Sequence, residues 1–358
     1  MSDSLMFSIT DGEPPLNIGM LRSNVGREKW YCLSKTMAER EAFKLAQENG
    51  LDVVTLCPSL VFGPLLQSNV NYSSLLLINF LKGSPELIET SRSGAFVDVR
   101  DVADALLLVY ETPNASGRYI CSLNQMQYTD LIDMLKNMYP SFKYPNNIPD
   151  KNEANDLSSE KLKKIGWKCR TLKETIDDSV KYYQEVTRRN SPSPIKDKEA
   201  KANTFQDKDM NRILILSNGS EKNAHLRKMD KAAENLQLFK ADLLDYNAIE
   251  AAIFGCEGVF HVASPVILSG ISNPEVELIR PALLGTRNIF KACSKTNIKR
   301  VVVVSSNAAI AINPDWPHGT IMDERCWLDE DFCRESEVII FLYFHIRGVF
   351  LSISDIIG

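Results

Sequence analysis

The stretch KRVVVVSS (299–306) decides the fold class, because it sets a run of valines directly before two serines. A run this short and apolar fits a strand buried on both faces of a parallel sheet. A second run, LDVVTLCPSLVFG (51–63), has the same character, and helical patterns lie between such runs, for example at 29–50 and 274–293. Strands alternating with helices predict an α/β fold with a doubly wound parallel sheet.

Composition limits the possible functions. The chain has 358 residues, enough for one large α/β domain or two small ones, and a net charge of −5 without a basic block, which argues against a nucleic-acid partner. Its 8 cysteines form no C-x-x-C pair, so we expect no metal site. The chain does not open with a secretory signal, and we expect reduced thiols and a cytoplasmic location.

The chain divides into five parts by pattern. We expect an N-terminal extension at 1–26, a first block at 27–190, a polar flexible linker at 191–210, a second block at 211–337 and an apolar tail at 338–358. The tail has about the length that spans a bilayer. His345, Arg347 and Asp355 interrupt it, which argues against a membrane anchor.

Two groups of residues could carry chemistry. Tyr31 and Lys35 stand four apart in a helical pattern and would share one face, where a lysine cation favours the tyrosinate and makes the tyrosine a better proton donor. Ser305 and Ser306 follow a strand at the edge where parallel sheets bind ligands. The plainer alternatives are a surface Tyr and Lys, and serines that only cap the strand end.

Longer motifs carry a family resemblance. KWYCLSKTMAEREA, LDVVTLCPSLVFGP, FVDVRDVADALLLVYE and GRYIC resemble the second half of cinnamoyl-CoA reductase-like and dihydroflavonol reductase-like enzymes, which are extended short-chain dehydrogenase/reductases of the NAD-dependent epimerase/dehydratase family. LFKADLLD, GVFHVASP, EVELIRPALLGTRNIFKAC and KRVVVVSS resemble their first half. The resemblance implies a Rossmann-type sheet with a small substrate-binding subdomain. It also implies NADP as cofactor and hydride transfer to a small-molecule carbonyl, such as a phenylpropanoid CoA thioester.

The resemblance also assigns roles by position. The serine before the Asn-Ala-Ala turn would orient the substrate, the tyrosine would donate the proton and the lysine would tune it. The implied residues are Ser306, Tyr31 and Lys35 for catalysis; Asp242, Leu243, Val262, Ala263, Ser264, Pro58 and Val61 for the cofactor; and Asn71 and Ser73 for the substrate. His261 would help to shape the cofactor floor or the core, and no metal ligand is expected.

The sequence departs from the family in three ways. The half that resembles the C-terminal part comes first, as in a circular permutation. No G-x-x-G-x-x-G occurs, so the first strand, glycine loop and helix are expected to be missing. The lignin-pathway motif N-W-Y-C-Y-G-K is replaced by K-W-Y-C-L-S-K, with Lys29, Leu33 and Ser34 differing.

These departures leave alternatives open. The halves could reassemble within one chain, or each could complete its sheet with a second copy by domain swapping. The protein could be an impaired reductase, or an inactive fusion or relic that binds no cofactor. In a reassembled chain, the 51–57 strand would lie beside the 300–304 strand, and the hydroxyls of Tyr31 and Ser306 would lie within about 3–6 Å. Cys333 would lie near Cys32, and Glu337 near Arg27.

Overall fold

A computed structural model describes residues 4–8, 28–65, 70–83, 93–145, 155–189, 212–217, 226–228, 232–265, 272–317 and 319–335. The predicted linker at 191–210 and the apolar tail at 338–358 lie outside the described residues, as do Arg27 and Glu337. Among the described residues, no helix combines the length and the apolar character needed to cross a membrane.

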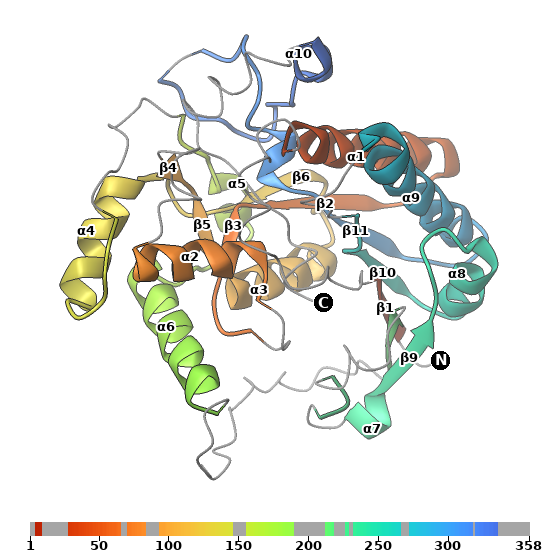
Figure 1. Ribbon diagram of the computed structural model, residues 1–358. Coiled ribbons are helices and arrows are strands. Elements are labelled where there is room, and N and C mark those ends of the chain that lie inside the picture. The colour runs from red at the N-terminus through yellow and green to blue at the C-terminus, as the bar shows by residue number, and fades with distance from the viewer. Residues whose placement is uncertain are drawn as a thin grey trace.

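A seven-stranded sheet forms the centre of the molecule (Figure 1), and its neighbouring strands all pair in parallel. Its spatial order is β6 (Gly117–Cys121), β2 (Val53–Pro58), β11 (Arg300–Val304), β10 (Gly258–His261), β1 (Ser4–Ser8), β8 (Arg212–Ser217) and β9 (Leu236–Lys240). The fold class predicted from the valine run, a parallel α/β sheet, is confirmed.

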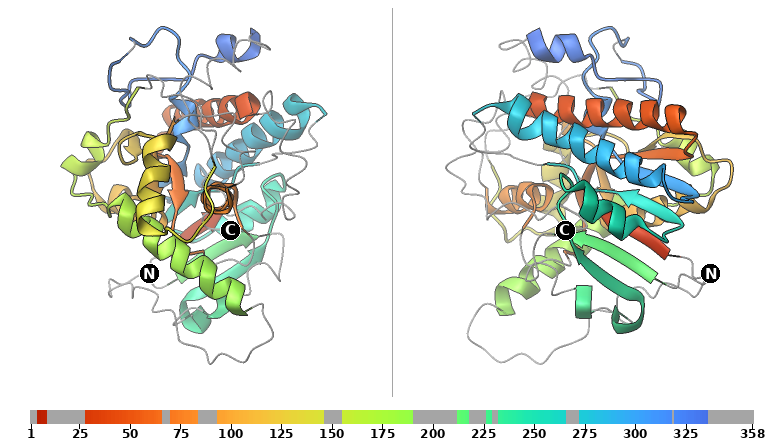
Figure 2. Two further views of the ribbon diagram at one scale, coloured as in Figure 1. Left: turned by 60° about the vertical axis from the view of Figure 1, so that its left-hand side comes forward. Right: turned by 90° about the vertical axis from the view of Figure 1, so that its right-hand side faces the viewer.

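Helices cover both faces of this sheet. α1 (Glu28–Asn49) and α9 (Arg280–Cys293) run side by side along one face (Figure 2), and α8 (Tyr246–Ile253) packs beside α9. α3 (Val99–Glu111) packs against β2 and β11 from the other face. Gly50 ends α1 with a φ of 65°, a left-handed conformation that glycine adopts at little cost, as predicted for this helix end.

The side chains of β11 alternate between these two layers. Val301 and Val303 belong to the core cluster that includes Ala42 of α1, whereas Val302 and Val304 belong to the cluster under α3. The same alternation brings every second residue of β2 toward α1. Both layers combine residues from the two sequence blocks, so the blocks share one core.

A smaller lobe lies beside the sheet and is built mainly from the first block (Figure 1). It holds two short pairs of strands, β3 with β5 in parallel and β4 with β7 antiparallel. Its elements are α2 (Tyr72–Lys82), α4 (Tyr128–Met138), α5 (Glu160–Lys164), α6 (Leu172–Arg189), β3 (Leu60–Phe62), β4 (Ser93–Gly94), β5 (Phe96–Asp98) and β7 (Met126–Gln127). The remaining short elements are η2 (Leu226–Lys228), α7 (Ala232–Asn235), η3 (Glu275–Ile279), η4 (Asn307–Ala309) and α10 (Glu330–Glu335).

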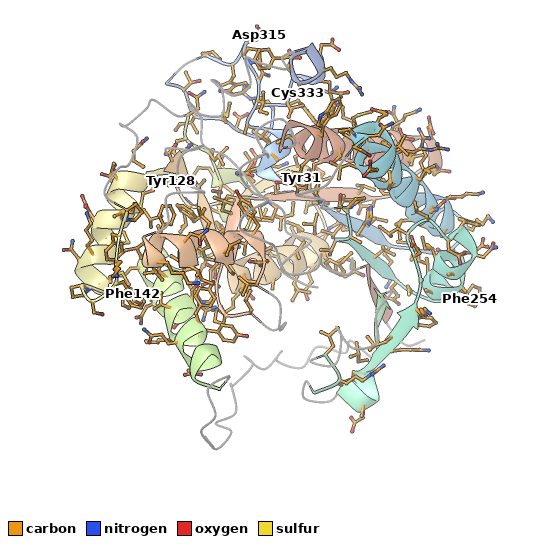
Figure 3. All side chains as sticks on the ribbon, in the orientation of Figure 1. Tyr31, Tyr128, Phe142, Phe254, Asp315 and Cys333 are labelled. Carbon is orange, nitrogen blue, oxygen red and sulfur yellow. The ribbon has the colours of Figure 1, made fainter. Side chains whose placement is uncertain are left out.

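A strand pairing and a hydrophobic cluster connect the two blocks. β2 of the first block pairs with β11 of the second, with Val301 opposite Val53 and Val304 opposite Leu56, which confirms the predicted neighbourhood. Cys32 of α1 and Cys333 of α10 are buried in one hydrophobic cluster, as predicted, and Figure 3 labels Cys333 and Tyr31 in this region.

The N-terminal residues correct one expectation. Residues 1–26 were expected to form an extension, and the first strand of the sheet was expected to be missing. The structure instead places Ser4–Ser8 as β1 between β10 and β8. In the strand order 3-2-1-4-5-6 of doubly wound sheets, β1 takes the first position, with β8 and β9 at the second and third. Five residues within a polar terminus give little periodicity, so the sequence pattern did not reveal this strand.

Candidate active site

The carboxyl ends of β10, β11 and β2 meet at one edge of the sheet, because these strands are parallel. Directly after them come Val262–Ser264, Ser305–Asn307 and Ser59, all of which are buried. This edge is where open α/β sheets bind ligands. Ser306 and the 262–264 segment, which were singled out by sequence motif, therefore lie at this edge.

The Tyr-x-x-x-Lys pair lies in the first two turns of α1, and both side chains are buried in the protein. Tyr31 and Lys35 are each only 2% exposed, so the alternative of a surface pair is wrong. The Lys35 Nζ lies 5.9 Å from the centre of the Tyr31 ring and donates to the carbonyl oxygen of Val304 at 3.4 Å. This hydrogen bond attaches the helix of the first block to the end of β11, two residues before Ser306.

Ser306 is fully buried and begins η4. Its Oγ accepts a hydrogen bond from the Ala308 amide at 3.1 Å and donates one to Oδ1 of Asn307 at 3.4 Å. The capping alternative thus describes a real contact. The single hydroxyl proton of Ser306 points to Asn307, so it would have to turn away from that oxygen to orient a substrate. α1 packs against η4, and the separation of the Tyr31 and Ser306 hydroxyls stays a prediction.

Two buried polar atoms fit a bound dinucleotide. Ser264 Oγ and Asn307 Nδ2 are buried and have no hydrogen-bond partner within the part of the chain that the structure describes. They follow β10 and β11, and buried polar groups without partners are rare unless a ligand or water satisfies them. Val262 and Ala263 are buried beside Ser264. The described residues at this edge therefore fit a polar cofactor.

The adenine-side candidates lie after β9. Asp242 is exposed, and its carboxylate accepts the Leu244 amide at 2.8 Å, which shapes the turn. Leu243 lies against Gly285 of α9 so closely that a Cβ added to that glycine would lie 3.1 Å from the Leu243 Cβ. A side chain at position 285 would push Leu243 back by a few tenths of an ångström, so the glycine lets the turn pack closely against α9.

The remaining candidates are buried in or beside the smaller lobe. Pro58 ends β2, and Val61 lies on β3, 2% exposed. Asn71 caps α2, because its side chain accepts the Ser74 amide at 2.9 Å, and Ser73 is 1% exposed. Their proposed roles toward cofactor and substrate are predictions.

His261 ends β10 and is buried at the same edge. Its Nε2 lies 3.1 Å from Oγ1 of Thr286, a hydroxyl that also donates to the Ala282 carbonyl at 2.9 Å. Burial, and then the nearby Lys35 charge, lower the pKa of His261 to about 3. The imidazole is therefore neutral, which agrees with the expected core role. No cluster of metal-ligating side chains occurs among the described residues.

Sequence reasoning missed a buried ion pair next to this edge. Glu39 lies one turn after Lys35 on α1. Its carboxylate accepts hydrogen bonds from Nε and Nη2 of Arg118 at 2.9 and 3.1 Å. Thr55 and Ser305 donate hydroxyl hydrogen bonds to the same carboxylate at 2.6 and 2.7 Å. An available signal was the spacing of Tyr31, Lys35 and Glu39, which repeats every four residues along one helix face.

Comparison with known proteins agrees with this geometry. Residues 10–121 match the NAD dependent epimerase/dehydratase family, and residues 213–325 match an NAD(P)H-binding family. Each half of the chain therefore resembles a family of nicotinamide dinucleotide-binding proteins, as the extended short-chain dehydrogenase/reductases are. Both family descriptions name a nicotinamide dinucleotide, in agreement with the buried polar atoms after β10 and β11.

The chain is 38% identical over 162 residues to cinnamoyl-CoA reductase 1 of Petunia hybrida, covering 44% of this chain and 48% of that protein. It is 36% identical over 152 residues to tetraketide alpha-pyrone reductase 1 of Arabidopsis thaliana, covering 42% and 47%. The solved vestitone reductase of alfalfa is 22% identical with a TM-score of 0.40, covering 51% of this chain and 65% of that one. This chain spans about half the length of the curated relatives it matches.

Proposed function

We propose that this protein is an NADP-dependent reductase that transfers hydride to the carbonyl of a phenylpropanoid CoA thioester or a related ketone. The observation that carries the proposal is the hydrogen bond from Lys35 to the Val304 carbonyl, because it joins the Tyr31 helix to the strand that precedes Ser306. Likeness to reductases of cinnamoyl-CoA and tetraketide pyrone type supports the substrate class.

Each catalytic residue has a distinct task in this proposal. Tyr31 donates a proton to the carbonyl oxygen as negative charge develops there, and Lys35 stabilises the resulting tyrosinate. Ser306 donates a hydrogen bond to the same oxygen and orients the carbonyl. Burial of all three residues keeps water away, which strengthens these interactions.

The cofactor contacts follow the edge of the sheet. Val262, Ala263 and Ser264 would lie beneath the dinucleotide, with Asp242 and Leu243 at its adenine side and Pro58 and Val61 at its nicotinamide side. A bound NADPH would supply the hydride. The Ser264 hydroxyl gains the hydrogen-bond partner that it lacks among the described residues. We expect Asn71 and Ser73 to contact the substrate.

The test combines binding with turnover. Quenching or enhancement of NADPH fluorescence on titration with the purified protein measures cofactor affinity. Steady-state assays with feruloyl-CoA, a dihydroflavonol and a tetraketide pyrone then measure reduction. Turnover of any of these that disappears in Tyr31→Phe supports the proposal, whereas NADPH binding without turnover of any of them contradicts it.

A second candidate is an inactive fusion or relic, and the missing glycine motif favours it. That motif supplies backbone amides and a helix N-terminus to the pyrophosphate. Losing such charge-assisted bonds, each worth about 1.5–3 kcal/mol, would weaken a micromolar site to millimolar or worse. We therefore propose impaired catalysis, and an NADPH titration that stays flat at millimolar concentration would favour the relic.

We also propose that the two blocks, 27–190 and 211–337, form one circularly permuted domain within a single chain. Support comes from the pairing of β2 with β11 within one chain. Domain-swapped self-association is the alternative, and sedimentation equilibrium of the purified protein separates a monomer from a dimer. All 8 cysteines are free thiols, which supports a reducing, cytoplasmic location.

A further inference from the structure

Helix α1 is attached to the end of β11 at two consecutive residues. Lys35 Nζ donates to the carbonyl oxygen of Val304 at 3.4 Å, and the hydroxyl of Ser305 donates to Oε2 of Glu39 at 2.7 Å. Lys35 and Glu39 lie one helical turn apart, so the two bonds fix both the height and the rotation of the helix against the strand. Ser306 is the next residue along the chain, and Tyr31 lies one turn before Lys35.

The carboxylate at the centre of this attachment has little freedom to move. Arg118 binds it with two nitrogens, and Thr55 donates to Oε1 at 2.6 Å. The side chains of Glu39 and Arg118 are 0% and 5% exposed. Bidentate geometry and burial make such a pair rigid.

Arg118 is held in turn by the second block. It donates to the backbone carbonyl of Cys326 at 2.5 Å and lies 3.6 Å above the Trp327 ring. The pair thus connects α1, β6 and β11 with the 326–327 segment.

We propose that Glu39 is a positioning residue, which acts through Ser305 to set the Ser306 hydroxyl against Tyr31. The kinetic part of this inference rests on the proposed reductase function. Two groups that must reach one carbonyl oxygen tolerate little error, since a displacement of about 1 Å can lower a rate about a hundredfold. A loosened β11 end would move Ser306 relative to Tyr31, which stays on α1.

Two variants separate positioning from general stability. Ser305→Ala and Thr55→Val each remove one hydroxyl bonded to the Glu39 carboxylate, at 2.7 and 2.6 Å, and both sites are buried. Only Ser305 adjoins Ser306, whereas Thr55 lies inside β2. We expect similar losses in the urea midpoint for both, and a kcat at saturating NADPH that is lower by about tenfold to a hundredfold only in Ser305→Ala. Equal kcat values in the two variants would overturn the inference.

A second readout does not depend on turnover. Incorporating 3-fluorotyrosine and assigning the Tyr31 ¹⁹F line by its absence in Tyr31→Phe gives a local probe of the site. We expect that line to shift or broaden in Ser305→Ala and to remain in place in Thr55→Val. An unchanged line in Ser305→Ala overturns the positioning role. A changed line in a protein that binds NADPH but reduces nothing supports it and counts only against the proposed function.

Discussion

Replacing Arg118 with methionine should destabilise the protein strongly, because the change leaves the Glu39 carboxylate buried without its cation. Breaking a buried pair from one side costs about 3–5 kcal/mol. Glu39 would keep hydroxyl bonds from Thr55 and Ser305, which soften the loss. The Cys326 carbonyl would lose its donor, which adds to the loss. We expect a decrease of about 3–4 kcal/mol in the free energy of unfolding.

The assay is urea unfolding followed by circular dichroism, with stability taken from the midpoint and slope. The matched control is Arg325→Met. The Arg325 side chain is 82% exposed and forms an ion pair with Asp323 at 2.7 Å. An exposed pair of this kind contributes about 0–1 kcal/mol. The double variant Glu39→Met with Arg118→Met removes both buried charges and should recover part of the loss. If Arg118→Met costs no more than Arg325→Met, the buried pair does not join the two blocks as argued.

Four further outcomes are expected, the first two from the proposed reductase function and the last two from the structure. Tyr31→Phe should lower kcat by about 10²–10⁴-fold with unchanged NADPH affinity, measured by steady-state kinetics and fluorescence titration. The NADPH dissociation constant of the unmodified protein should be millimolar or weaker, and a micromolar value would show that the missing glycine motif has been overrated. Burial and the Lys35 charge lower the pKa of His261 from 6.5 to about 3. Between these two pH values the unfolded chain is protonated at His261 and the folded chain is not. The contribution of neutral His261 to the free energy of unfolding should be fully present above about pH 6.5 and should fall by up to ~1.4 kcal/mol per pH unit below that value. His261→Asn should flatten this slope, measured by urea titrations at several pH values. Deleting residues 1–8 should leave β8 and β10 without a shared neighbour and lower the thermal midpoint, whereas an unchanged midpoint would mean that β1 contributes nothing.

The sequence predicted the parts of the fold that depend on strong periodicity. The valine run at 301–304 and the apolar run at 53–58 became adjacent strands, because each leaves a row of backbone groups that another buried strand must satisfy. α1 ended at Gly50 as its turn chemistry indicated. The N-terminal strand Ser4–Ser8 was not predicted, since its place in the sheet depends on pairing with β10 and β8 rather than on its own pattern.

Sequence motifs predicted the chemically reactive residues of the candidate site, but they did not predict the contacts that hold those residues in place. Tyr31, Lys35 and Ser306 stood out because their types and spacing imply a reaction. Arg118 gave no such signal, and Glu39 gave only its four-residue spacing after Lys35, because a carboxylate on a helix and an arginine on a strand are ordinary surface residues unless the fold buries both. Their pairing spans 79 positions and could be recognised only once β6 and α1 were in place.

The two serines after β11 illustrate why a motif alone could not divide the work between them. Successive residues of a strand point to opposite faces, and Val303 packs toward α1 while Val304 packs toward α3. Ser305 continues the α1 side and reaches Glu39, and Ser306 turns into η4, where its hydroxyl caps the Ala308 amide. A single-residue slip in register would place Val304 or Ser306 opposite Glu39 and would change which residue precedes η4. The hydrogen bond from Ser305 to Glu39 therefore fixes the register in which Ser306, the serine assigned to the proposed reaction, precedes η4.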